Sequence, residues 1–400
     1  MVGESIEGMK KRELLRSLID ANKVGDLMRK KFETVDPETA LSDVVSKMKS
    51  SDLHEIPVVD GKKLVGVISY GAVIRKKNLV IGTKAKTMVE TTPEINIDTP
   101  LTEVAEHFLS TGYRQLPVTK GKALLGIVTR ANVISVLPKL KEIKALKIAD
   151  VMSDSARSIH EKDLIKNAMS LMRDLEVRTV PVVDDQDRLV GIIGIRDIVQ
   201  YSWTGPGTQA MGRQDKGGNN NPVEMEVRSL MHDSPITMTA EDDLTKAINT
   251  MVEKNISTIP VVSGDRMVGI VTKYDILELV ASVRNRDMVY TQISGLDEED
   301  RFSLEIMEKE MQSGLVKISK FTRPLLFTIH VSKYNNTGNR AKYSLIGRLS
   351  TENSHFMTKA VDWSLGQATV ELMNNLDRIV KDKKEHNLDV RMKKNLHKKV

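Results

Sequence analysis

Four copies of one pattern fill most of the chain and restrict the folds that it can adopt. Met28, Met88, Met152 and Met231 are each followed, 29 residues later, by a proline within an apolar run. A glycine comes nine residues after that proline, or ten in the third copy, and begins the heptads GVISYGA, GIVTRAN, GIIGIRD and GIVTKYD. Four copies that keep these offsets indicate a repeated structural unit.

The fourth copy shows most clearly what each unit should form. Leu244, Ala247, Ile248 and Met251 have the spacing of one apolar helix face, and residues 257–272 predict two strands joined by a tight turn. A unit of about 60 residues with one apolar face cannot bury that face alone. We therefore expect copies one and two to form one pair, and copies three and four to form a second.

The series from the methionine through IPVV to GIVT..D resembles the CBS domain, named after cystathionine beta-synthase. The resemblance implies α/β CBS repeats in two tandem pairs, which act as regulatory modules in many proteins. It predicts a helical lead-in at 1–23, one pair at 24–140, a second pair at 141–283 and a further domain at 284–400. The Gly- and Asn-rich stretch 201–222 predicts a flexible insertion in the second pair.

In CBS domains the end of this heptad commonly meets the ribose and phosphate of an adenine nucleotide, so the resemblance implies a nucleotide site. A carboxylate can accept hydrogen bonds from both ribose hydroxyls, and a hydroxyl at a helix N-terminus can donate to phosphate. Since only the third and fourth heptads end in Asp, we expect AMP, ADP or ATP mainly in the second pair, with no cofactor required. The expected nucleotide-binding residues are Pro235, Ile236, Thr237, Thr258, Ile259, Pro260, Thr272, Lys273, Asp275, Arg196 and Asp197.

Helix capping is the alternative role of the heptad. Thr272 and Asp275 could satisfy free N–H groups at the start of the following helix without any ligand. At the last heptad position Asn132 replaces the carboxylate in the second copy, and Ala72 offers no polar atom in the first. Both roles remain open from the sequence.

A different pattern begins near residue 287. Its expected elements are a strand (287–295), a helix (297–321), three strands (324–335, 340–352 and near 354–358) and a long helix from Val361 or Asp362. The order β-α-β-β-β-α predicts an α+β domain.

That order, the segment HVSKYNNTGNRAKYSLIGRLS and the helix entry AVDWSLGQATVELMNNLDRIVKDKK resemble the N-terminal domain of bacterial hibernation-promoting factor. They resemble more closely archaeal proteins that join such a domain to CBS repeats. Asp362 and Ala368 fit the family's helix entry, whereas Trp363 stands where Tyr is common. The resemblance implies a ribosome dormancy factor that docks on small-subunit rRNA in the mRNA and tRNA path and inhibits translation, with the CBS repeats as nucleotide sensor or scaffold. The alternative is a CBS-based, adenine-nucleotide-sensing regulator of another protein or of DNA.

The distribution of charge favours a polyanionic partner for the C-terminal part. From Lys317 onward the chain has 17 Lys and Arg against 7 Asp and Glu, whereas the first 283 residues carry equal numbers of both. Such an excess suits phosphate contacts, although a solvated helix end is the simpler alternative. Lys342, Ser344 and Arg348 are expected to face outward from their strand. The expected RNA-binding residues are Lys333, Arg340, Lys342, Arg348, Lys359, Lys381, Lys383, Lys384, Arg391, Lys393 and Lys394.

Several classes of site and compartment are disfavoured by the composition. The chain has no Cys, and its eight His residues show no ligand spacing, so we expect no metal site. No nucleophile–base set or P-loop is visible, so we expect no enzymatic activity. No signal-peptide pattern and no run of about 18 apolar residues is present, which predicts a cytoplasmic protein without a membrane partner. CBS pairs often associate face to face, so we also expect that two copies of the chain can pair.

Overall fold

The computed structural model describes most of the chain. The described residues are 6–51, 53–69, 72–73, 82–153, 157–174, 177–195, 197–198, 224–284, 289–294, 296, 303–337, 340–351 and 355–397. The expected insertion at 201–222 and the expected site residue Arg196 lie outside them.

The first two repeats share one five-stranded sheet of order β1-β2-β5-β4-β3. Within each repeat two strands form an antiparallel hairpin, and the repeated proline lies inside the first strand of that hairpin. The elements, after the lead-in helix α1 (Ile6–Asp20), are α2 (Val24–Leu27), α3 (Leu41–Ser50), β1 (Glu55–Asp60), β2 (Lys63–Ser69), η1 (Ala85–Met88), β3 (Ile95–Asn96), α5 (Leu101–Thr111), β4 (Gln115–Lys120), β5 (Ala123–Thr129) and α6 (Arg130–Ile134).

Repeats three and four follow the same plan, with a four-stranded sheet β6-β7-β8-β9 and a hairpin β10-β11. In the fourth repeat Leu244, Ala247, Ile248 and Met251 are buried along one face of a helix, as their spacing predicts. The elements, after η2 (Leu137–Lys139) at the end of repeat two, are α7 (Lys141–Lys144), η3 (Ile148–Asp150), β6 (Ile159–His160), α8 (Ile165–Asp174), β7 (Thr179–Val183), β8 (Leu189–Gly194), η5 (Val227–Ser229), β9 (His232–Asp233), α10 (Leu244–Glu253), β10 (Thr258–Ser263), β11 (Arg266–Thr272) and α11 (Lys273–Ser282).

The repeated methionine and the repeated glycine meet across each pair. The segment after Met152 crosses the strand at Gly269, where an added Cβ would lie 2.9 Å from the Ser153 carbonyl oxygen and 3.1 Å from the Met152 sulfur. Met28 covers Gly126 in the same way, since a Cβ there would be 2.6 Å from its sulfur. The glycines therefore recur because a neighbouring repeat passes too close for a side chain.

The two pairs are joined into one body, called here the repeat assembly (residues 24–284). Helices α5 and α6 of repeat two and α10 and α11 of repeat four bury one common apolar core that includes Phe108, Leu116, Ile248 and Leu277. Repeats one and three also meet, because Arg178 lies 2.8 Å from the imidazole of His54. The four repeats thus surround a common centre.

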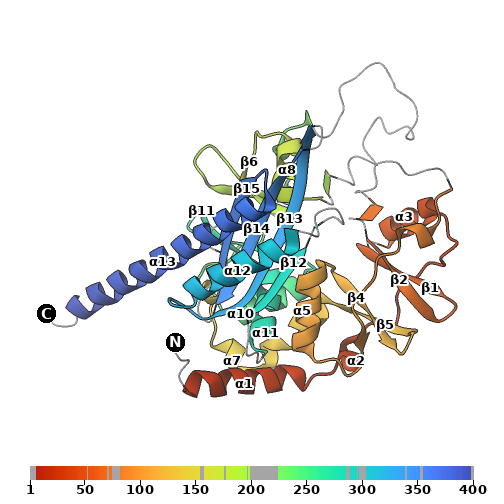
Figure 1. Cartoon of the computed structure of the whole chain (residues 1–400), viewed down its shortest axis with the longest axis horizontal. Helices are drawn as coiled ribbons and strands as arrows, with labels where there is room; N and C mark the ends of the chain where they lie inside the picture. Colours follow the sequence, from red (N-terminus) through yellow and green to blue (C-terminus); the bar gives the residue numbers. More distant parts are fainter. Residues whose placement is uncertain are drawn as a thin grey trace.

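The C-terminal part has the element order that the sequence predicts. Its sheet has the order β12-β13-β14-β15, with β12 parallel to β13 and the other pairs antiparallel. Helices α12 and α13 cover one face around Phe327, Ile329, Leu345 and Leu349, and α13 extends beyond the body of the molecule in Figure 1. The elements are β12 (Tyr290–Ser294), α12 (Leu304–Ile318), β13 (Pro324–Thr337), β14 (Arg340–Thr351), β15 (His355–Asp362) and α13 (Leu365–His397).

Two expectations for this domain are wrong in detail. The last helix begins at Leu365 rather than at Val361 or Asp362, because β15 continues to Asp362 in register with β14. The second face of the sheet, which was expected to face solvent, is covered. Leu326 on this face joins the apolar core of repeats two and four, and Ser344 is buried. The sheet is covered by helices on one side and by the repeat assembly on the other.

Candidate anion site at the centre of the repeats

The polar ends of the heptads cap the helices that follow them. Thr272 is the N-cap of α11, and Asp275 accepts hydrogen bonds from the Thr272 backbone N–H and hydroxyl, both at 2.7 Å. In the second repeat Asn132 accepts from the Thr129 N–H at 2.9 Å and its hydroxyl at 2.7 Å. An amide oxygen can cap as a carboxylate does, which explains why Asn is tolerated at this position.

Each Asp of the second pair also contacts the segment that crosses from the partner repeat. The Ser153 hydroxyl donates to Asp275 at 3.2 Å, and His232 Nε2 lies 2.9 Å from Asp197. The structure therefore divides the expected nucleotide-binding residues into two clusters, one for each Asp. Ser153 was not expected from the sequence, although its place directly after Met152 is a recurring one that could have indicated it.

The other expected nucleotide-binding residues are distributed around these clusters. Thr258 lies opposite Thr272 in the β10–β11 hairpin, and Ile259 and Pro260 are buried in β10. In the preceding segment Pro235 is half-buried, whereas Ile236 and Thr237 are exposed. The segment runs from β9, which pairs with β8, to Met238, whose N–H donates to Pro260.

Basic side chains from three repeats converge between the two pairs. The position three residues before the repeated proline holds His54, Arg114, Arg178 and Ser257 in the four copies. Arg114 lies 2.7 Å from one imidazole nitrogen of His54, and Arg178 lies 2.8 Å from the other. This column of residues was not expected from the sequence, although it becomes visible when the four copies are aligned on their prolines.

The geometry around His54 favours an additional acceptor at this place. A guanidinium only donates hydrogen bonds, and a neutral imidazole accepts at one nitrogen while the other carries its proton. The two contacts of His54 cannot both be hydrogen bonds accepted by one neutral imidazole. An anion between the guanidinium groups of Arg114 and Arg178 would accept from both of them.

Arg130 and Lys273, from the heptads of repeats two and four, complete what we call the cationic centre: Arg114, Arg130, Arg178 and Lys273. Burial lowers the pKa of Arg130 to about 10, and it lowers the pKa of Lys273 to about 8 with help from the charges of Arg114 and Arg130. Both shifts mean that the positive charges are poorly solvated and repel one another.

Glu55 is the buried carboxylate beside these cations. It is 1% exposed, and one of its oxygens accepts from the Arg114 backbone N–H at 3.2 Å. Burial raises the pKa of Glu55, against the lowering effect of Arg178, Arg130 and Arg114. Glu55 alone does not balance these four cations, so the centre has the charge to hold a multiply charged anion.

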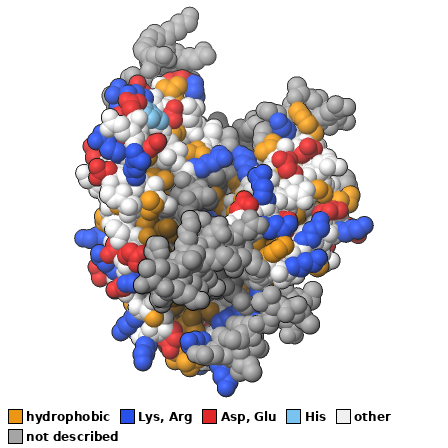
Figure 2. All heavy atoms as spheres, turned by 90° about the vertical axis from the view of Figure 1, so that its left-hand side faces the viewer, with side chains coloured by type: hydrophobic (Ala, Val, Ile, Leu, Met, Phe, Trp, Pro, Cys, Tyr) orange, Lys and Arg blue, Asp and Glu red, His pale blue; other side chains and the backbone are white. Residues whose placement is uncertain are grey.

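The expected RNA-binding residues lie in three different settings. Lys342 lies over the Trp363 ring at 5.7 Å, and Arg348 lies over the ring of Tyr274 in the repeat assembly at 4.4 Å. Lys333, Lys359, Lys381 and Lys383 are half-buried in the domain. The side chains of Arg340, Lys384, Arg391, Lys393 and Lys394 lie outside the described ones. On the face seen in Figure 2, described Lys and Arg side chains are interspersed with Asp and Glu.

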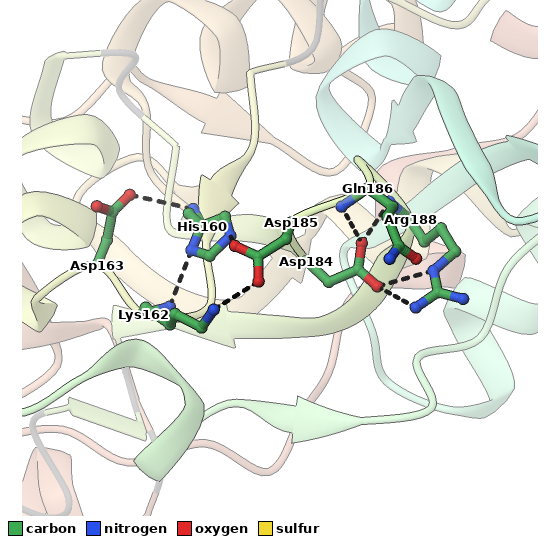
Figure 3. Close-up of polar contacts among 7 residues, drawn as sticks. All are labelled: His160, Lys162, Asp163, Asp184, Asp185, Gln186 and Arg188. Carbon is green, nitrogen blue, oxygen red and sulfur yellow. Dashed lines mark hydrogen bonds and ion pairs between the residues drawn. The ribbon is translucent and has the colours of Figure 1, made fainter.

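A depression with a volume of about 350 Å³ lies near the hairpin tips of repeats three and four. Its lining includes Thr237, Val262 and the two ends of one turn, Asp184 and Arg188. Asp184 accepts from the Arg188 side chain at 2.8 Å, and this bond, with others, lowers its pKa to about 2. Neighbouring Asp185 binds Lys162 and His160, as Figure 3 shows. Asp184 is thus engaged in closing the turn and Asp185 in ion pairs with Lys162 and His160, so the depression is a weaker candidate than the cationic centre.

The comparison with protein families identifies the repeats. The model of the CBS domain matches residues 24–78, 88–139, 148–204 and 227–282, so the chain belongs to the CBS-domain family. The expected four CBS repeats are thereby confirmed. No helix in the described part of the chain is long and apolar enough to cross a membrane.

Individual relatives agree with this assignment. An uncharacterized protein of Methanocaldococcus jannaschii, MJ1404, is 26% identical over 361 residues, which cover 88% of this chain and 83% of the relative. The crystal structure of MJ1225 from the same organism covers 64% of this chain and 99% of its own, with a TM-score of 0.53 and 23% identity. That likeness shows the fold of the repeats.

Proposed function

We propose that the protein is a CBS-domain regulator that binds an adenine nucleotide, with the phosphates of the ligand at the cationic centre. The observation that carries the proposal is the convergence of Arg114, Arg130 and Arg178 around the buried Glu55, with Lys273 near Arg114 and Arg130. Phosphates accept several charge-assisted hydrogen bonds at once, which suits guanidinium groups held close together. Asp275 and Thr272, through the ribose, would orient the nucleoside.

The test is calorimetric titration of the full chain with AMP, ADP and ATP, and with inorganic triphosphate to separate phosphate from adenine recognition. The variant Arg114→Met should weaken nucleotide binding about tenfold or more, because a hydrogen bond to a charged group contributes roughly 1.5–3 kcal/mol. Arg228→Met is the control, since Arg228 is exposed and pairs with Glu226. No heat with any nucleotide at millimolar concentration would exclude the proposal. We further propose binding without turnover, so the ATP should be recovered unchanged.

A ribosome dormancy factor is the second candidate function. It is favoured by the β-α-β-β-β-α order of the C-terminal domain and by the excess of Lys and Arg from Lys317 onward. Phosphate contacts would make binding to the small subunit steeply dependent on salt. Sedimentation of the full chain with purified 30S subunits at two salt concentrations tests this role. Migration apart from the subunits at low salt would leave the nucleotide-sensing regulator as the function. The same sedimentation, without subunits, tests self-association through the repeat pairs.

A further inference from the structure

The C-terminal domain contributes a charged side chain next to the cationic centre. The guanidinium of Arg348, on β14, lies 4.4 Å from the centroid of the Tyr274 ring, and that of Arg130 lies 6.0 Å from the same centroid. Tyr274 stands in the heptad of repeat four, directly between Lys273 and Asp275. One aromatic ring thus connects the C-terminal domain to the residues proposed to bind the nucleotide.

The position of Arg348 is set by an extensive contact between the domain and the repeat assembly. Arg348 lies on the sheet face that carries Leu326, which is 2% exposed and packs into the core of repeats two and four. On the same face Ser350 is 1% exposed, and the Gln292 amide donates to the Ser110 carbonyl of α5 at 2.7 Å. The contact therefore combines apolar and polar groups, and it directs Arg348 towards the centre.

Docking of the domain adds positive charge where positive charge is already in excess. The charge of Arg348, like that of Arg178, lowers the pKa of Arg130. The buried carboxylates in this region are Glu55, Asp275 directly after Tyr274 and, one helical turn after Tyr274, Glu278. The region thus holds five cations, including Arg348, and three buried carboxylates. An anion at the centre would offset the repulsion and would interact more strongly when Arg348 is present.

We propose that the bound anion couples the C-terminal domain to the repeat assembly, with Arg348 as a residue of the anion site supplied by the C-terminal domain. This inference rests on the proposed function, because it takes the nucleotide phosphates as the anion. Ligand binding and domain docking are then linked, and each strengthens the other by the same factor. An empty centre loosens the domain from the repeats, and an occupied centre holds it in place.

The experiment compares nucleotide binding by three variants of the full chain. With ATP as the probe, Arg348→Met should weaken binding about tenfold, as expected for loss of a charged contact. Arg378→Met is the matched control, because Arg378 is an exposed arginine of the same domain on α13. It should bind ATP within twofold of the unsubstituted chain. Arg114→Met removes a guanidinium of the cationic centre and tests whether ATP binds there.

Hydrogen exchange of the unsubstituted chain provides a second readout that requires no substitution. Saturating ATP should slow exchange in β12 and at the α5 residues that meet the C-terminal domain, and Arg348→Met should reduce that protection. If the unsubstituted chain binds no ATP, the proposed function itself fails. The proposed function stands if ATP binds the unsubstituted chain and Arg114→Met weakens that binding. The coupling is nevertheless refuted if the Arg348→Met variant binds ATP equally or more tightly and ATP leaves hydrogen exchange at the contact unchanged.

Discussion

At the scale of single residues, the close approach between repeats predicts that the repeated glycines do not tolerate a side chain, and Gly269 provides the test. Gly269→Ala would place a methyl group 2.9 Å from the Ser153 carbonyl oxygen, and Gly269 is not in the left-handed region, so crowding is the whole effect. We expect the free energy of unfolding to fall by about 1–3 kcal/mol. Val268→Ala, at an exposed neighbour, should cost about 0.5 kcal/mol or less. Equal losses in urea unfolding would mean that the strand crossing tolerates a side chain.

Lys273 predicts how stability depends on pH in the absence of ligand. Its pKa of about 8 in the folded protein is below the value of about 10.4 for an unfolded chain. Between these values the unfolded state binds more protons, so stability should rise with pH from about 8 to about 10.4. Lys273→Met should be more stable than the unsubstituted chain at pH 7, and the difference should shrink as pH rises through this window.

The measurement is urea unfolding of both proteins at pH 7, 9 and 10.5. Lys254→Met serves as the control, because Lys254 is exposed and its replacement should change the free energy of unfolding by about 0.5 kcal/mol or less. A difference between Lys273→Met and the unsubstituted chain that stays constant over this range would show that Lys273 titrates normally. Addition of a nucleotide that binds the centre should raise the pKa of Lys273 and flatten the slope.

At the scale of elements, the lead-in helix α1 caps a helix of the second repeat. The N-cap residue of α5, Pro100, provides no side-chain hydrogen bond, and Asp20 instead accepts from the Thr102 N–H and hydroxyl, both at 3.0 Å. Asp20→Ala should lower the free energy of unfolding by about 1–2 kcal/mol, as loss of an N-cap does. Asp98→Ala removes an exposed ion pair with Lys23 and should cost about 0–1 kcal/mol. If thermal unfolding shows no difference between the two variants, Asp20 does not act as a cap.

The sequence predicted elements well where the pattern is local. The helix at Leu244–Met251, the hairpins and the β-α-β-β-β-α order follow from spacing within one segment. The contact of Arg348 with Tyr274 could not be predicted in this way, because an alternating strand does not reveal what covers its second face. Likewise, convergence of His54, Arg114 and Arg178 depends on how two pairs are packed, and no spacing within one repeat encodes that.

At the scale of the whole molecule, Arg284 joins the end of the repeat assembly to α5. It contacts Glu106, whose side chain is 7% exposed, and Glu103 at 3.1 Å. Arg284→Met would leave Glu106 poorly neutralised, so we expect a loss of about 2–4 kcal/mol in the free energy of unfolding. A double-mutant cycle with Glu106→Gln should give a coupling energy above about 1 kcal/mol. The exposed pair of Lys23 and Asp98 should give less than about 1 kcal/mol, and equal couplings would contradict the structural role of Arg284.

Within each pair, the segment that begins the first repeat crosses the last strand of the second repeat. This crossing also governs the order in which the chain can fold during synthesis. The backbone of Arg29 exchanges hydrogen bonds with Ile127, and that of Ser153 with Ile270. The first segment of each pair therefore has no partner until the last strand of that pair has emerged. The pair, rather than the single repeat, is then the smallest unit that can fold co-translationally. A nascent chain with residues 1–140 outside the ribosome should hold a protease-resistant body, whereas one with only residues 1–80 outside should expose unpaired strand edges to chaperones.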